Sequence, residues 1–429
     1  MIRCATRRWC SLFLAIIFLL GLGGLSIWAE TVAGGGRDSE YHFDVRVLLA
    51  KELVNRAYLS KAAPGSAASE LWLLSSPEGF TATDRQNGIT EKLGDTTIAI
   101  GVRAGRLTIN GRRLRANNIE LVPISGATAF GKYRYAGTMH VMLDPNGEIF
   151  LVNRLDVEDY VFSVIRWESV PGWPIEANKA MAIACRTYLV HMVLSARRER
   201  TGKTYHYDLG ATNLHQTYRG LHEFDDLRIP VDETRGVIMA WRDVPEGKLR
   251  VVLALYDACC GASNPSKMGG VINLKNQPCL GRDKVCRFCQ KCKLFKWHKS
   301  YTRAEFETLI RESCPALFRD KRTRVTDARV SKRDESRVVH RMQVKVGGTW
   351  YSLTGEQAYG IFRGIKSRMF TIKSDGRTIT FRGRGYGHGL GLCQWGAYRQ
   401  AKLGWDCYEI LAFYYTDAIL FTTVRATGS

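Results

Sequence analysis

The chain has 429 residues, of which 45% are hydrophobic and 24% are charged. This is the balance of a folded globular protein, so general disorder is excluded, and the length is sufficient for two or three domains. The net charge of +21 indicates an anionic binding partner. Membrane surfaces, nucleic acids and acidic cell-wall polymers are all anionic.

The N-terminal segment has the pattern of an export signal or a membrane anchor, which we assign to residues 1–30. Arginines precede an uncharged apolar run from about Cys10 to Trp28. Because the run is long and the cleavage sites near it match poorly, we favour an uncleaved anchor over a secreted protein. Basic residues ahead of the run predict a periplasmic or otherwise extracytoplasmic location for the rest of the chain. Export, and the lack of any nucleic-acid-binding signature, exclude nucleic acid as a partner.

A short linker, residues 31–39, leads to a stretch with alternating apolar residues, residues 40–150. Asn110-Gly111 supplies turn chemistry between two of its expected strands. We expect an N-terminal antiparallel β domain, a sandwich or a barrel, without a catalytic cluster.

Residues 151–429 are expected to form a mixed α/β catalytic region with a long central helix and several β hairpins, which makes the fold class α+β. Apolar positions from Val157 onward predict a helix that Pro171 and Gly172 end, and a second helix runs from Pro174 to about Glu199. Further strands and turns predict hairpins between residues 325 and 353 and around residue 375.

Glu168 lies at the junction between the two predicted helices. Its neighbours in the sequence include Trp167, Val170 and Trp173. Apolar surroundings raise the pKa of a carboxyl group by desolvation, as a general acid working near neutral pH requires. We therefore predict that Glu168 is a general acid.

Two cations on the second predicted helix accompany this carboxylate. Lys179 and Arg186 are seven residues apart and share one face of the helix. They are either ordinary exposed residues or ligands in the cleft of Glu168. Since the helix is otherwise rich in small apolar residues, we favour the cleft.

Six of the twelve cysteines lie in a Cys-rich insertion at about residues 257–300. The run Cys286-x-x-Cys289-x-x-Cys292 has a spacing that suits a thiolate metal site, and Cys279 is the fourth candidate ligand of a structural zinc. In an exported protein, disulfides compete with metal binding, and we favour disulfide or mixed use.

Alternating glycines mark the last motif, from Gly383 to Gly391, which presents His388 on an uncluttered loop ahead of Gln394. The glycine spacing is not that of a dinucleotide-binding fingerprint. Chemistry alone leaves a structural histidine and a site histidine equally open.

Three stretches, in this order, resemble the SpoIID/LytB family of sporulation and cell-wall proteins. They are Val152-Asn-Arg-Leu-Asp-Val-Glu-Asp-Tyr160 through Glu168 to Arg186-Thr-Tyr188, then His215-Gln216-x-Tyr218-x-Gly220, then the glycine block up to Tyr414-Tyr415. With Tyr133-Arg-Tyr-Ala-Gly137 upstream, the resemblance covers most of the chain after the leader. The family is identified as lytic transglycosylases that cleave peptidoglycan glycan strands stripped of stem peptides by an amidase; some members are described as amidase enhancers.

The resemblance implies a catalytic role for Glu168 and no cofactor in catalysis. It implies a cell-wall amidase as partner and glycan strands as substrate. It also implies a set of substrate-binding residues: Lys179, Arg186, Gln216, Tyr218, His388 and Gln394.

A lytic transglycosylase needs one carboxyl group, which acts as acid and then as base while a 1,6-anhydro ring closes. Hydrolytic glycosidases place a second carboxylate opposite the first. Asp156, Glu158 and Asp159 are available, but we expect them to cap or solvate their helix.

This sequence departs from the family pattern in three places. Gly210 and Leu214-His215 stand, without a cysteine, where some members bind zinc. Cys260-Gly-Ala-Ser-Asn264 replaces Cys-Gly-Gly-x-Thr, and Cys393 replaces a serine. Two alternatives therefore stay open beside the transglycosylase: a non-catalytic, glycan-binding amidase enhancer and a lysozyme-like hydrolase.

Overall fold

The structure is a computed structural model that describes residues 44–54, 69–198, 206–212, 215–243, 247–270, 273–318 and 320–422. The predicted anchor, residues 1–30, and the linker, residues 31–39, lie outside the described residues. Within the described ranges, no helix is long and apolar enough to cross a membrane.

The chain forms two compact units. The described residues of the N-terminal unit are 44–172, 181–238 and 421–422, and those of the C-terminal unit are 173–180 and 239–420, with the gaps given above. The predicted boundary at residue 150 falls inside a strand, β12 (Glu148–Asp156), so the units do not separate there.

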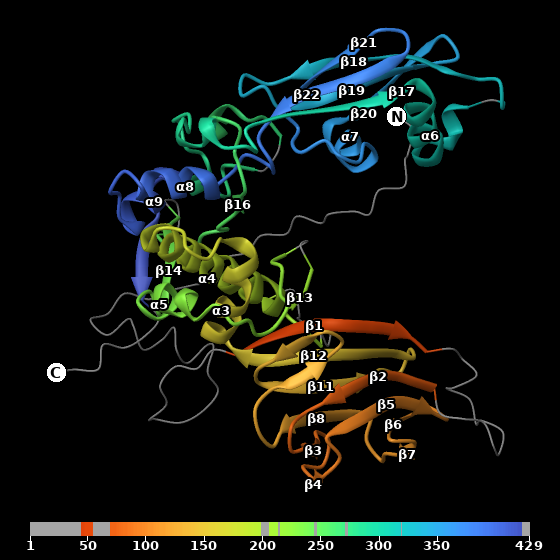
Figure 1. The fold of residues 1–429 in the computed structure, drawn as a ribbon, viewed down its shortest axis with the longest axis vertical. Coiled ribbons are helices and arrows are strands. Elements are labelled where there is room, and N and C mark those ends of the chain that lie inside the picture. The colour runs from red at the N-terminus through yellow and green to blue at the C-terminus, as the bar shows by residue number, and fades with distance from the viewer. Residues whose placement is uncertain are drawn as a thin grey trace. The chain divides into compact units, whose positions relative to one another are not determined.

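Two β-sheets make up the first part of the N-terminal unit (Figure 1). One has the strand order β13-β1-β12-β11-β8-β3-β4, and the other has the order β10-β9-β2-β5-β6-β7. The remaining bounds in the first sheet are β1 (Asp44–Leu53), β3 (Phe80–Asp84), β4 (Thr90–Leu93), β8 (Asn118–Pro123), β11 (Thr138–Leu143) and β13 (Leu209–Gly210). Those in the second sheet are β2 (Ser69–Ser75), β5 (Thr97–Arg103), β6 (Arg106–Ile109), β7 (Arg112–Arg113), β9 (Thr128–Phe130) and β10 (Tyr133–Tyr135).

Alternation along these strands produces the core of the unit. Val45 and Val47 of β1 are fully buried, as are Ile98 and Ile100 of β5, because residues two apart point to the same face of a sheet. All neighbouring strands pair antiparallel except β1 with β13. The predicted antiparallel strands in this region are confirmed.

Helix α3 (Val157–Glu168) follows β12 without a loop. The side chain of Asp156 caps it by accepting a hydrogen bond from the backbone N–H of Glu158. Helix α4 (Ile175–Arg198) begins after Pro174, and α5 (Arg228–Asp232) follows the short 3-10 helix η1 (Asp225–Leu227). The two predicted helices and the break between them are confirmed.

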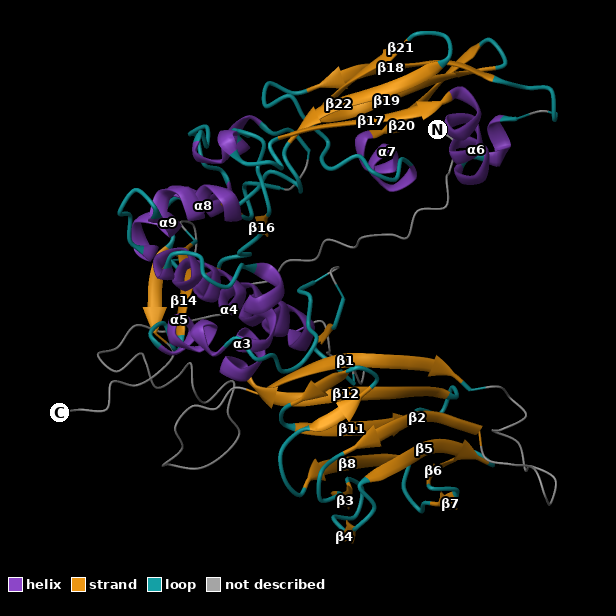
Figure 2. Ribbon diagram, in the orientation of Figure 1, coloured by secondary structure: helices purple, strands orange, loops and turns teal. Residues whose placement is uncertain are grey.

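Two three-stranded sheets build a hydrophobic core in the C-terminal unit. One is ordered β17-β22-β21 and the other β18-β19-β20. Their bounds are β17 (Lys296–Thr302), β18 (Val325–Arg333), β19 (Val339–Val346), β20 (Thr349–Thr354), β21 (Phe370–Ser374) and β22 (Thr378–Arg384). Helices α6 (Arg303–Ser313) and α7 (Gly355–Ile361) pack against these strands (Figure 2).

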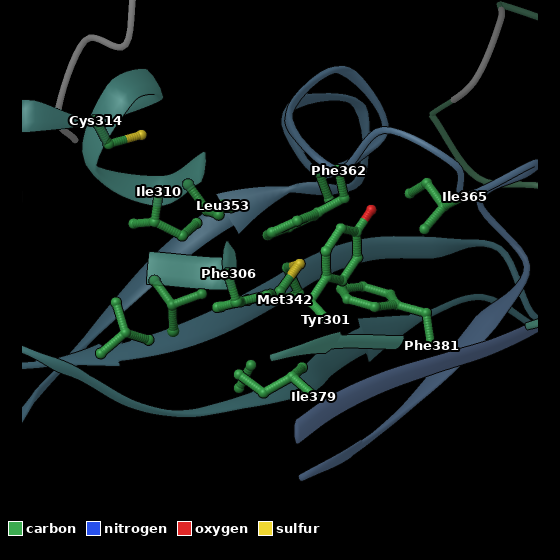
Figure 3. Packing of buried hydrophobic residues seen from close by; sticks show 14 of the residues in the cluster. Tyr301, Phe306, Ile310, Cys314, Met342, Leu353, Phe362, Ile365, Ile379 and Phe381 are labelled. Atoms are coloured by element: carbon green, nitrogen blue, oxygen red, sulfur yellow. The ribbon is translucent and has the colours of Figure 1, made fainter. Parts of the chain in front are cut away.

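Aromatic side chains fill the space between these strands and helices (Figure 3). The rings of Phe306 and Phe362 stack with centroids 4.7 Å apart, and Phe381 lies 5.0 Å from Phe362. The hairpins predicted in this region are confirmed, and the fold class is α+β as expected.

Short elements join the remaining parts of the chain. Strand β14 (Val237–Arg242) pairs with β15 (Leu249–Val251) and neighbours β24 (Ile419–Thr422), while β16 (Tyr256–Asp257) pairs with β23 (Leu392–Cys393). The helices are α8 (Gln394–Ala401) and α9 (Cys407–Tyr414), with the 3-10 turns η2 (Pro265–Lys267), η3 (Pro278–Leu280), η4 (Phe288–Lys291) and η5 (Pro315–Leu317).

Candidate active site

Glu168 is the last residue of α3. The helix ends there because the next residue, Ser169, is extended, and its N–H closes the last turn on the carbonyl of Ile165 at 2.8 Å. The carboxylate oxygen Oε1 of Glu168 accepts a hydrogen bond from the backbone N–H of Thr217 at 2.7 Å. The structure thus joins two motifs that are about 50 residues apart in the sequence, and it joins them at the predicted general acid.

Two tyrosines border this carboxylate. Burial raises the pKa of Tyr188 to about 12, and the negative charge of Glu168 acts in the same direction. Burial also raises the pKa of Tyr160 well above its usual value, with a smaller contribution from Glu168. Both phenols therefore stay protonated at neutral pH. Tyr188 belongs to the Arg186-Thr-Tyr188 motif but was not among the predicted site residues.

The apolar neighbours named in the sequence do not enclose Glu168 as expected. Trp167 is 39% exposed and Val170 is 44% exposed. The guanidinium carbon of Arg219 lies 4.4 Å from the Trp167 ring centroid, and that of Arg166 lies 5.2 Å from it. The end of α3 thus presents a half-exposed aromatic ring with two cations stacked on it.

Arg186 lies in the core of the N-terminal unit, and the prediction that it projects into a cleft is wrong. Its side chain is 1% exposed, and it donates from Nε and NH2 to the two carboxylate oxygens of Glu158 at 2.9 and 2.6 Å. It also donates to the backbone carbonyls of Val231 and Val237. A buried guanidinium requires such partners, so Arg186 ties α4 to α3 and to the chain around α5.

Gln216 and Tyr218 are also buried, at 0% and 2% exposure. The prediction that their side chains bind substrate directly is therefore wrong. Gln216 accepts a hydrogen bond from the Tyr160 hydroxyl at 3.1 Å and donates to the carbonyl of Cys185 at 3.2 Å. The Tyr218 hydroxyl donates to Asn153 of β12, and its ring stacks on Tyr160 with centroids 5.2 Å apart. The side chains of Gln216 and Tyr218 anchor the loop that contains Thr217. The backbone N–H of Thr217 in this loop donates to Glu168.

A glycine closes the same loop against the sheet. Gly220 has φ +69°, and a Cβ atom there would lie 2.0 Å from the carbonyl oxygen of Arg134 in β10. Only glycine fits this close approach. The motif from His215 to Gly220 is therefore a positioning loop, and its contribution to the site is the Thr217 N–H, which no side-chain pattern could have indicated.

The three acidic residues that precede Glu168 all have other partners. Asp156 caps α3, Glu158 pairs with Arg186, and Asp159 accepts from Arg228 at 3.2 Å. The expectation that they serve the helix and not the reaction agrees with these contacts.

Lys179 and Gln394 belong to the C-terminal unit. The Nζ atom of Lys179 lies 2.9 Å from Oε1 of Glu176, whose other carboxylate oxygen accepts from the backbone N–H of Cys407 at 2.8 Å. Gln394 is the first residue of α8. In this unit the start of α4 is therefore tied to α9.

His388 is held by backbone groups on its glycine-rich loop. Its Nδ1 accepts from the N–H of Leu390 at 3.1 Å, and desolvation of the partly buried ring lowers the pKa of His388 to about 4. Its ring is neutral at physiological pH and carries no charge for an anionic ligand. The side chain is 37% exposed, so it remains reachable.

Asp257 of β16 lies beside His388 and was not predicted. Its Oδ2 accepts from the N–H of Gly389 at 2.6 Å and lies 4.0 Å from Nδ1 of His388. Burial raises the pKa of Asp257 to about 8, so this residue is a neutral carboxylic acid at pH 7. Gly387 has φ +127°, and a Cβ atom there would lie 2.3 Å from Cβ of Asp257. The alternating glycines thus allow the loop to pack on this acid.

The cysteines group differently from the predicted set. The Sγ atoms of Cys260, Cys286, Cys289 and Cys393 lie within 4.8 Å of one another. Cys279 is outside this group, and Cys292 lies 3.6 Å, sulfur to sulfur, from Cys259. None of the ten cysteines among the described residues forms a disulfide, contrary to the favoured expectation.

Comparison with known proteins identifies the class. Residues 145–241 match the family model of SpoIID, stage II sporulation protein, and residues 260–391 match a domain of unknown function, DUF8618. The first range contains α3, α4 and the loop with Thr217. Residues 145–241 are therefore a SpoIID-family domain, and curated relatives named stage II sporulation protein D support this assignment.

Individual proteins are also similar to this chain. The chain is 28% identical over 331 residues to an uncharacterized protein of Brachyspira hyodysenteriae, covering 76% of this chain and 82% of that protein. It is 24% identical over 279 residues to stage II sporulation protein D of Bacillus subtilis, covering 62% and 74%. A shorter stretch of 56 residues is 43% identical to the amidase enhancer of Bacillus subtilis, covering 13% of this chain and 8% of that protein.

Proposed function

We propose that the protein is an exported lytic transglycosylase that cleaves peptidoglycan glycan strands, with Glu168 as the catalytic residue. One observation carries the proposal: the backbone N–H of Thr217 donates a hydrogen bond to the Glu168 carboxylate. Both residues lie inside the segment that matches the SpoIID family model. The buried side chains of the same loop make that N–H a rigid donor, as a positioned catalytic group requires.

The reaction needs one carboxyl group in two protonation states. Glu168 protonates the glycosidic oxygen while the bond from that oxygen to C1 of the muramoyl sugar breaks. The C6 hydroxyl of the same sugar then bonds to C1, and the Glu168 carboxylate takes its proton. The product is a 1,6-anhydromuramoyl end, no water is consumed, and Glu168 returns to its starting state. The engagement of Asp156, Glu158 and Asp159 elsewhere favours this route over hydrolysis with a second carboxylate.

The surface beside Glu168 suits a sugar chain that carries acidic groups. The half-exposed Trp167 offers a flat apolar face, and Arg166 and Arg219 place positive charge on it. Strands without stem peptides expose the lactyl carboxylates of the muramoyl sugars. The net charge of +21 favours the same polymer.

Product analysis tests the proposal. The full-length protein is incubated in detergent with peptide-free glycan strands, and the ends are identified by mass spectrometry. We expect anhydromuramoyl ends, and we expect Glu168→Gln to lower their rate of formation by about 10²-fold or more. Glu223→Gln removes the same charge from an exposed position in the same unit and should leave the rate unchanged. Reducing ends in place of anhydro ends would show hydrolysis.

A glycan-binding amidase enhancer is the second candidate. The observation that favours it is the 43% identity over 56 residues to a protein of that name. In this case neither the wild type nor Glu168→Gln cleaves glycan, both bind it, and both stimulate a cell-wall amidase on intact peptidoglycan. Both candidates place the protein outside the cytoplasmic membrane, held by residues 1–30.

A further inference from the structure

Four cysteine sulfurs from three separate segments converge in the C-terminal unit. Cys260 follows β16, Cys286 precedes the 3-10 turn η4, Cys289 lies within that turn, and Cys393 ends β23. All four residues are buried, with exposures of 0% or 1%. The separation in sequence exceeds 130 residues between Cys260 and Cys393, so this arrangement is a product of the tertiary fold.

The spacing of the sulfurs fits one tetrahedral ion. A Zn–S bond of about 2.3 Å implies about 3.8 Å between sulfurs at the corners of a tetrahedron. The sulfurs of Cys260 and Cys289 are 3.7 Å apart, and all four lie within 4.8 Å of one another. A polynuclear iron–sulfur cluster needs room for its own irons and sulfides between the ligands, which this spacing does not leave.

The surroundings supply hydrogen bonds to the sulfurs. The backbone N–H of Cys260 lies 3.3 Å from Sγ of Cys393, and the hydroxyl of Tyr414 lies 3.3 Å from Sγ of Cys286. Gly396 makes room for this contact, since a Cβ atom there would lie 3.1 Å from the same sulfur. Donors of this kind stabilise negative charge on thiolate ligands.

A buried cation lies beside the same tyrosine. Arg282 is 1% exposed, and its Nε and NH2 have no hydrogen-bond partner among the described residues. Its guanidinium carbon lies 5.5 Å from the ring centroid of Tyr414 and 5.1 Å from that of Phe413. The third nitrogen, NH1, donates to the backbone carbonyl of Lys284. A buried guanidinium that lacks a counter-ion is costly. A zinc ion with four thiolates carries a net charge of −2, which would offset the +1 charge of this guanidinium.

We propose that Cys260, Cys286, Cys289 and Cys393 bind one Zn²⁺ in a closed structural site. Four protein ligands leave no open position for substrate, so the ion acts on the fold and not on the reaction. It joins the Cys-rich insertion to the glycine block, because its ligands come from both segments. The same two segments also meet where β23 pairs with β16 and where the carboxyl oxygen Oδ2 of Asp257 accepts from the Gly389 N–H. Coordination also keeps these thiolates from oxidation in an exported protein.

Metal analysis of the full-length protein tests the site. Protein purified without chelator should contain about one zinc per chain, and replacement by Co²⁺ should give the visible absorption of a tetrahedral thiolate site. Cys260→Ser and Cys393→Ser should each lose the metal. Cys279→Ser and Cys292→Ser are the matched controls and should keep it, since their sulfurs lie outside the group.

A second measurement covers ligand variants that fail to fold. Wild-type protein treated with a strong chelator should expose four thiols to alkylation and lower its Tm, and added zinc should reverse both changes. Three results would overturn the proposal: wild-type protein without metal whose four cysteines are disulfide-bonded, iron in place of zinc, or full zinc content in Cys393→Ser.

Discussion

The buried ion pair between α3 and α4 gives the sharpest test of the structure. Glu158 is 3% exposed and accepts two hydrogen bonds from Arg186 and one from the backbone N–H of Gly236. The substitution Glu158→Gln keeps the size of the side chain and removes its charge. It leaves the Arg186 guanidinium buried without an anion.

The cost follows from the burial of both groups. Removing one partner of a buried pair destabilises a protein by about 3–5 kcal/mol, because the remaining charge has lost both solvent and counter-ion. The loss for a unit of this size corresponds to a fall in Tm of roughly 6–20 °C. Asp159→Asn is the matched control on the same helix. Asp159 and Arg228 are 41% and 34% exposed, and an exposed pair contributes about 0–1 kcal/mol.

Thermal and urea unfolding of the full-length variants, followed by circular dichroism, measure both effects. The double variant Glu158→Leu/Arg186→Met should recover much of the lost stability, since it buries no charge. Equal unfolding midpoints for Glu158→Gln and Asp159→Asn would refute the reasoning. If Arg186→Met left stability unchanged and weakened glycan binding, the result would support the original prediction that Arg186 lies in the cleft.

Three further predictions concern other parts of the molecule. Thr217→Pro removes the N–H that holds Glu168 and should lower cleavage by about 10-fold or more, whereas Thr217→Ala keeps it and should cleave like the wild type; equal rates would show that the hydrogen bond is dispensable. Phe306→Ala leaves a cavity at a fully buried position that contacts the rings of Phe362 and Phe381. In urea unfolding it should lower the stability of the C-terminal unit by about 3–5 kcal/mol, and a loss below about 1 kcal/mol would contradict this packing. Asp257 has a folded pKa of about 8 and an unfolded pKa near 4, so the folded state holds the extra proton between these values and stability falls as the pH rises. His388, with a folded pKa of about 4 and an unfolded value near 6.5, opposes this slope below about pH 6.5; stability should therefore fall by about 1–2 kcal/mol between pH 6.5 and 8, and Asp257→Asn should abolish that fall in unfolding measured across the range.

Local chemistry made the helices and hairpins predictable. Pro171, Gly172 and Pro174 ended one helix and began the next, and the structure has α3 and α4 on either side of them. Thr302 and Glu305 form the capping box that starts α6, a signal contained within four residues of the sequence. These signals act between residues close in sequence, so they can be read without knowing what packs against them.

Side-chain burial was less predictable. Periodicity placed Lys179 and Arg186 on one face of α4, but it did not show that another helix covers Arg186 with a matching carboxylate. Burial of an arginine depends on a partner 28 residues away, and an exposed arginine has the same local pattern. The burial of Gln216 and Tyr218 was equally hard to predict, because their hydrogen-bond partners come from other parts of the chain. Their motif contributes a backbone N–H, that of Thr217, to the candidate site.

The cysteines show the same limit. The spacing of Cys286, Cys289 and Cys292 favours a local set of ligands. In the structure the chain turns through η4, Cys292 moves toward Cys259, and the remaining places in the group are taken by Cys260 and Cys393. Only the pairing of β16 with β23 brings these two together.

The sequence by itself determined the resemblance to the SpoIID family, the fold class and the choice of Glu168 as the candidate acid, because each depends on residue types at short spacings. The tertiary structure decided which polar residues are buried supports and which groups meet. It assigned Arg186, Gln216 and Tyr218 to the core, gave Glu168 a backbone donor from Thr217, and gathered four cysteines around one point. The reason is physical: the free energy of a charged or polar side chain depends on what lies within a few ångströms, and in these cases the neighbours come from distant parts of the chain.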